Sequence, residues 1–133
     1  MISVPEDQDI SLVEMPGSTI WLDKSGIVYA ITKKHPPQTI EQAKASLAEF
    51  RRHIGPEKVC LLIDVTHSNE TMPEVRDYVA QEFPKIVKAI AMVSGSALGK
   101  MVANLFFNLK SQPYPVKMFS DEREAKAWLK QYL

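Results

Sequence analysis

Hydrophobic and polar positions alternate with a period of two near the start of the chain, a pattern that predicts β-strands. Within residues 18–23, Ile20 and Leu22 alternate with polar or aromatic residues, as in a half-buried strand. Residues 26–32 are rich in β-branched and aromatic side chains. Gly26 can adopt the positive φ that a tight connection requires, so the two segments are expected to form a β-hairpin.

Four later segments repeat apolar residues every three or four positions, the spacing that predicts amphipathic helices. The first begins at Thr39, whose hydroxyl can cap the free amides while Gln42 completes a capping box. Thr71 and Glu74 have the related Thr-x-x-Glu spacing, so Thr71 is expected to cap the second helix. The helices are expected at about 39–54, 71–83 and 96–110, and from Ser120 or Asp121 to about Tyr132.

The segments between these helices predict strands and set the architecture. Residues 59–65 and 86–93 are apolar on both faces, as in central strands covered by helices. Residues 116–119 form a last short strand. The order is an N-terminal β-hairpin followed by α-β-α-β-α-β-α, which predicts an α/β fold with a mostly parallel sheet.

One domain accounts for this pattern. No repeat, low-complexity segment or linker divides residues 18–133, and a chain of 133 residues is long enough to bury a substantial core. Residues 1–17 contain two prolines and are expected to be a lead-in segment of uncertain structure. Within it, Ile10–Met15 is a possible short extra strand.

Composition narrows the function classes. The chain has 16 Lys and Arg residues against 16 Asp and Glu residues, so nucleic-acid binding by charge alone is not expected. Cys60, the single cysteine, lies in an apolar run and predicts a buried, reduced thiol in a cytoplasmic protein. No apolar stretch reaches the roughly 18–20 residues that a membrane span needs.

A polar edge is expected where the parallel strands end. Carboxyl ends of neighbouring parallel strands meet at one edge of a sheet, which is where α/β proteins usually bind ligands. The side chains that follow these strands are Asp64, Thr66, His67, Ser68, Thr71, Ser94 and Ser96. They predict either a small polar or phosphorylatable site, with Thr71, Ser68, Asp64 and Ser96 as candidates, or hydroxyl groups that only cap helices and shape turns.

Catalytic motifs are incomplete in this chain. Asp64, His67 and Ser68 lie too close in one loop for a hydrolase triad, and Asp64 is expected to accept hydrogen bonds at its strand end. The run Gly95–Met101 resembles a phosphate-binding loop, but its glycines are too close and Met101 replaces the magnesium ligand. The three histidines lie in separate segments, so neither a metal site nor a cofactor is expected, and the chain is not expected to be an enzyme.

The predicted helix at 96–110 carries few charges. Phe107 interrupts the polar face opposite its apolar stripe, which includes Leu98 and Met101. If these side chains are exposed, they form a candidate surface for self-association or for a hydrophobic ligand. A helix buried on most sides is the alternative.

Four segments resemble the small bacterial STAS-like (SpoIIAA-like) domains, an uncharacterised branch of them in particular: IWLDKSGIVYAI, CLLIDV, AIAMVSGSALGKMVANLFF and YPVKMFSDEREAKAWL. The resemblance covers about residues 18–133 and implies a sheet wound as a β-α superhelix. In anti-sigma-factor antagonists of this fold, a partner kinase phosphorylates a Ser or Thr within an Asp-Ser-Ser/Thr-Gly segment. At that turn this chain has Asn69-Glu70-Thr71-Met72-Pro73, where Thr71 is the closest positional match and Ser68 the next.

The resemblance and the incomplete catalytic motifs together predict a function. We expect a non-enzymatic regulatory or protein-interaction module, whose partner is another protein or a second copy in a homodimer. Related folds also occur in lipid-carrying domains. The alternative is therefore a domain that binds a small anion or a hydrophobic, lipid-like ligand.

Overall fold

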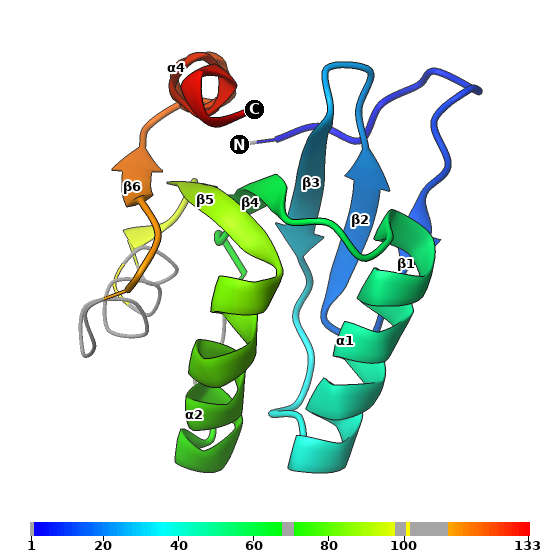
Figure 1. Cartoon of the computed structure of the whole chain (residues 1–133), viewed down its shortest axis with the longest axis vertical. Helices are drawn as coiled ribbons and strands as arrows, with labels where there is room; N and C mark the ends of the chain where they lie inside the picture. Colours follow the sequence, from blue (N-terminus) through cyan, green and yellow to red (C-terminus); the bar gives the residue numbers. More distant parts are fainter. Residues whose placement is uncertain (1, 68–70, 98–100, 102–111) are drawn as a thin grey trace.

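The computed structural model describes residues 2–67, 71–97, 101 and 112–133, and it contains one six-stranded sheet with helices on both faces (Figure 1). The strands lie side by side in the order of the sequence. They are β1 (Val13–Glu14), β2 (Ser18–Leu22), β3 (Ile27–Thr32), β4 (Val59–Asp64), β5 (Val87–Val93) and β6 (Val116–Phe119). The helices are α1 (Ile40–Ile54), α2 (Pro73–Glu82), η1 (Phe83–Lys85), α4 (Glu122–Leu129) and η2 (Lys130–Tyr132).

The predicted hairpin and parallel sheet are confirmed. Strands β2 and β3 pair antiparallel, whereas β3, β4, β5 and β6 pair parallel in turn. The hairpin turns at Asp23, whose carboxylate accepts hydrogen bonds from the amides of Ser25 and Ile27. Gly26 has a φ of 93°, the positive region that only glycine adopts without strain.

Helices α1 and α2 run side by side in the same direction across one face of the sheet (Figure 1). Leu47, Phe50 and Ile54 of α1 pack against a buried cluster that includes Val28, Leu61 and Ile90 of three adjacent strands. The capping box at Thr39 is confirmed, because its hydroxyl accepts from the Gln42 amide and the Gln42 side chain accepts from the Thr39 amide.

Helix α4 covers the opposite face, near both ends of the chain (Figure 1). Ala125 and Leu129 are fully buried there against Cys60 and Leu62 of β4. The Asp121 carboxylate accepts from the Glu124 amide and caps the helix. Of the two expected caps, Ser120 and Asp121, the structure therefore uses Asp121.

The lead-in segment contributes to both the sheet and the core. Val13 and Glu14 form β1, which pairs antiparallel with β2, so the possible extra strand at Ile10–Met15 is present but only two residues long. Ile2 is buried in the same cluster as α4. Among the described residues, no helix is long and apolar enough to cross a membrane.

Truncation of Leu129 tests the packing of α4. Leu129→Ala should lower the free energy of unfolding by about 2–5 kcal/mol, because a fully buried leucine leaves a cavity in a core that relaxes only partly. Leu22→Ala is the matched control, since this side chain is 47% exposed. Urea unfolding followed by circular dichroism measures both, and equal losses in the two variants would contradict the packing.

The pH dependence of stability tests the tether between the hairpin and α4. Lys126 of α4 lies 3.2 Å from the Asp23 carboxylate. Burial raises the pKa of Asp23, but hydrogen bonds from Ser25 and Ile27 and the Lys126 ammonium outweigh it, so the pKa lies below its usual 3.8. A lowered folded-state pKa stabilises the protein above the unfolded-state value, and this contribution disappears as the pH falls through the folded-state value.

Asp23→Asn should therefore reduce stability at pH 7, and its difference from the wild type should shrink below pH 3.8. Lys126→Met should move the loss of stability to higher pH, because the Asp23 pKa rises when the cation is removed. Urea unfolding across this pH range measures both effects. A difference between wild type and Asp23→Asn that stays constant at acid pH would contradict the assignment.

Candidate functional site

The carboxyl ends of β3, β4 and β5 meet around one buried carboxylate. Asp64, the last residue of β4, is only 2% exposed. Its Oδ2 accepts from the amide of Ile2 at 3.1 Å, and its Oδ1 accepts from the amide and hydroxyl of Thr66. A buried carboxylate without such donors would carry a large desolvation cost. The expectation that Asp64 accepts hydrogen bonds at its strand end is confirmed.

Thr66 connects the β4 loop to the loop after β5. Its hydroxyl oxygen accepts from the Gly95 amide at 2.8 Å while the hydroxyl proton goes to Asp64. Its carbonyl accepts from the Ser96 hydroxyl, also at 2.8 Å. The Ser94 hydroxyl donates to the Ser96 carbonyl at 2.6 Å, which tightens the second loop.

Thr32, the last residue of β3, adds the third strand to this arrangement. Its hydroxyl donates to the Asp64 carbonyl at 2.7 Å and accepts from the His67 amide at 3.3 Å. The predicted meeting of the loops after β3, β4 and β5 is therefore present. We call Thr32, Asp64, Thr66, Ser94 and Ser96 the strand-end cluster.

Every hydroxyl proton of the strand-end cluster is donated within the cluster. Each serine and threonine donates to a carbonyl or to the Asp64 carboxylate. In a Ser-His-Asp triad the nucleophilic hydroxyl would instead donate to a histidine, which the carboxylate holds in place. The Asp64 carboxylate is occupied by Ile2 and Thr66, not by a histidine. The geometry therefore stabilises the loops and has the hydrogen-bond pattern of a structural cluster.

The expected cap at Thr71 is wrong. Helix α2 begins at Pro73 and its cap position is Met72, which makes no side-chain cap hydrogen bond. Proline is favoured in the first turn of a helix, because it lacks the amide proton that would be unpaired there. Pro73 thus fixes the start of α2 two residues after Thr71, too late for the Thr-x-x-Glu spacing to close.

The other predicted site residues have different outcomes. Ser96 joins the strand-end cluster, and Met101 is 54% exposed. Thr71 is half-buried at the approach to α2. Ser68, Leu98 and Phe107, like most of the predicted helix at 96–110, lie outside the residues that the structure describes.

Two residues at this edge make contacts that the sequence did not predict. Thr32 ends a strand that was expected to reach the shared edge, but its side chain was not among the candidates. Ile2 is hydrogen-bonded to a residue 62 positions away, a contact with no local signal. Only the folded chain brings these residues to Asp64.

Cys60 is buried, as predicted, and is a free thiol. Its sulfur lies 3.8 Å from the carbonyl of Leu129, to which it donates. Burial raises the pKa of the thiol, while the Lys88 charge lowers it to a smaller extent. In the described part of the chain, no three His, Cys, Asp or Glu side chains gather as a metal-binding group.

The comparison with solved structures defines the fold. A crystal structure of an uncharacterized protein from the DUF3478 family of Shewanella loihica PV-4, described as having a SpoIIAA-like fold, matches with a TM-score of 0.53. It is 20% identical, and the match covers 90% of this chain and 91% of that chain. The present chain thus has a SpoIIAA-like fold, and the predicted resemblance is confirmed at this level.

The chain belongs to the family described as "Domain of unknown function (DUF7793)", whose model matches residues 20–133. A protein with unknown function from Arthrobacter sp. FB24 is 22% identical, covering 83% of this chain and 96% of its own, with a TM-score of 0.30. No curated protein matches the chain.

Removal of the Asp64 charge tests the strand-end cluster. Asp64→Asn should cost about 1–3 kcal/mol of unfolding free energy. The NH₂ group of asparagine would face one of the groups that now donate to the carboxylate, and two donors cannot form a hydrogen bond with each other. Asp9→Asn, at an exposed position, is the matched control. Urea unfolding at neutral pH measures both changes. If Asp64→Asn proves as stable as the wild type, the cluster does not hold this edge together.

Proposed function

We propose that this chain is a non-enzymatic regulatory module that binds a protein partner through the surface at the start of α2. The observation that carries the proposal is the exposure of Met72 beside the closed strand-end cluster. Met72 is 41% exposed immediately before the first residue of α2. A methionine side chain is flexible and polarizable, so an exposed one can adapt its shape to a partner surface.

A second exposed methionine supports a binding surface at the same edge of the sheet. Met101 follows the carboxyl end of β5, as Met72 follows the carboxyl end of the adjacent strand β4. Between the two strand ends, the strand-end cluster uses its hydroxyl protons internally. Recognition by apolar contact next to a rigid polar support fits a binding surface better than a reaction site.

Thr71 supplies a point of control for this surface. Within the described ranges its hydroxyl makes no hydrogen bond, in contrast to Thr32 and Thr66, and it is half-buried next to Met72. Phosphorylation would add about 1.5–2 negative charges next to the start of α2. That charge would be favourable for the helix dipole and would change the surface that a partner meets.

Photocrosslinking in the native host tests the proposal. With benzoylphenylalanine in place of Met72, irradiation should give a discrete adduct with one partner protein, or with a second copy of the chain. The same amino acid in place of Leu22 is the matched control, because Leu22 is also exposed but ends a strand that runs antiparallel to β3, away from this edge.

Thr71→Glu in the Met72 variant should change the adduct yield at least about threefold, because the added charge lies beside the crosslinker. Thr71→Ser should leave the yield unchanged. Mass spectrometry identifies the adducts. Adducts of equal yield and identity at positions 72 and 22, or none at position 72, would contradict the proposed surface.

A further inference from the structure

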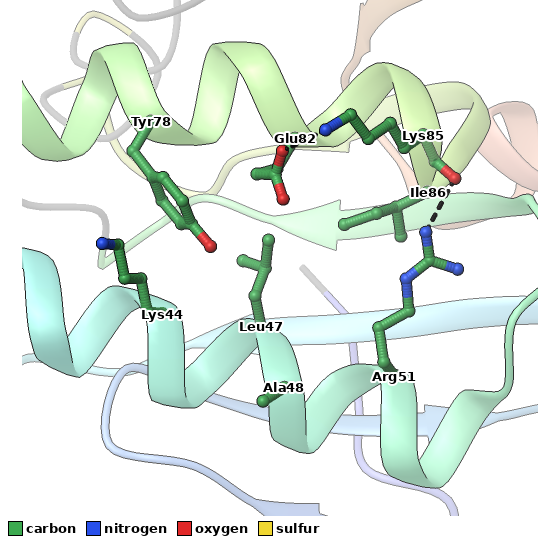
Figure 2. Close-up of a pocket in the computed structure, with 8 residues that line it drawn as sticks. All are labelled: Lys44, Leu47, Ala48, Arg51, Tyr78, Glu82, Lys85 and Ile86. Atoms are coloured by element: carbon green, nitrogen blue, oxygen red, sulfur yellow. Dashed lines mark hydrogen bonds and ion pairs between the residues drawn. The ribbon is translucent and has the colours of Figure 1, made fainter.

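A groove lies between α1 and α2 (Figure 2), and no residue of the strand-end cluster lines it. Its volume is about 210 Å³. Leu47 of α1 and Ile86 after η1 form its apolar floor, which continues into the core beneath. Figure 2 shows the Tyr78 hydroxyl and the Glu82 carboxylate directed toward the space between the helices.

Two cationic side chains mark the ends of the groove. At one end, the Lys44 ammonium lies 5.7 Å from the centre of the Tyr78 ring. At the other end, the Arg51 guanidinium donates to the carbonyl of Lys85 at 2.9 Å and to that of Pro56 at 2.7 Å. These contacts bridge α1 to α2 at one end and to η1 at the other, and the apolar floor lies between them.

The charges of the groove are unbalanced even though the whole chain is neutral. Glu82 pairs with Lys85 at 2.8 Å, so these two charges offset each other. Lys44 and Arg51 form no ion pair with any acid in the described part of the chain. The groove therefore combines two uncompensated positive charges with an apolar floor, and an occupant that matches it carries negative charge and apolar side chains.

The spacing of the two cations fits a helical peptide segment. Pockets for drug-sized ligands usually measure about 300–1,000 Å³, more than this groove provides. Lys44 and Arg51 are about two helical turns apart on α1, roughly 10 Å along its axis. A helix laid along the groove would place acidic side chains about two turns apart at the two cations and apolar side chains between them on the floor.

We infer that the groove between α1 and α2 binds an acidic amphipathic helix of a protein partner, with Lys44 and Arg51 as its charge contacts and Leu47 and Ile86 as its apolar contacts. This surface is separate from the one at Met72. Either proposal can therefore fail without the other.

Two synthetic peptides of roughly 16 residues test the inference. The first carries two glutamates about two turns apart on one face of the helix. Its leucines lie on the same face between them, one turn after the first glutamate. The second has the same composition and net charge, but its glutamates lie on the opposite face. Fluorescence anisotropy with the full chain should give a dissociation constant at least about tenfold lower for the first peptide.

Charge reversal then assigns the binding to the groove. Lys44→Glu should weaken binding of the first peptide at least about fivefold, because an attraction becomes a repulsion. Lys130→Glu is the matched control, since Lys130 is exposed beyond α4, on the other face of the sheet, and should change binding less than about twofold. Thermal unfolding checks that both variants remain folded.

Three results would overturn the inference: no binding of the first peptide at about 1 mM, equal affinity for the two peptides, or equal weakening by the two charge reversals. A third variant, Leu47→Gln, should also weaken binding if its fold is retained. If Leu47→Gln unfolds the chain, the comparison of Lys44→Glu with Lys130→Glu still decides the question.

Discussion

The buried carboxylate of Asp64 is the constraint on which the edge of the sheet depends. A carboxylate that is 2% exposed has to be supplied with hydrogen-bond donors by the fold itself. The donors come from Ile2 at the beginning of the chain and from Thr66 in the loop that follows β4. Thr66 in turn accepts from Gly95 after β5. One side chain thus ties together segments that are far apart in the sequence.

This constraint also bears on the proposed binding surfaces. The hydroxyl groups at the strand ends donate hydrogen bonds within and between these loops. The polar side chains that the sequence places at this edge therefore hold the loops together. The surfaces that we propose for partners lie on the helices. They are the exposed start of α2 at Met72 and the groove between α1 and α2, and neither includes a residue of the strand-end cluster.

Local patterns in the sequence predict most of this fold, because its strands and helices have clear periodicities and caps. The capping box at Thr39 and the turn at Gly26 form as their own segments specify. The same type of reasoning failed at Thr71, where the rigid ring of Pro73 set the start of the helix instead. Propensities compete locally, and the capping motif was the weaker signal.

The candidate site was predictable only in part, for a physical reason. The meeting of strand ends follows from parallel topology, so Asp64 and Ser96 could be placed at one edge. The contact of Ile2 with Asp64 and the contact of Arg51 with the Lys85 carbonyl join residues that are 62 and 34 positions apart. Such contacts arise from tertiary packing, and no periodicity within one segment encodes them.

Amide hydrogen exchange in the Asp64→Asn variant tests the central claim most directly. If this carboxylate holds the edge together, the amides of Ile2, Thr66 and Gly95 should exchange faster in the variant, while the Leu62 amide in the middle of β4 should keep its protection. Two-dimensional NMR measures each amide separately. Unchanged exchange at Ile2 and Gly95, or a uniform acceleration that includes Leu62, would contradict the claim that Asp64 organises this edge.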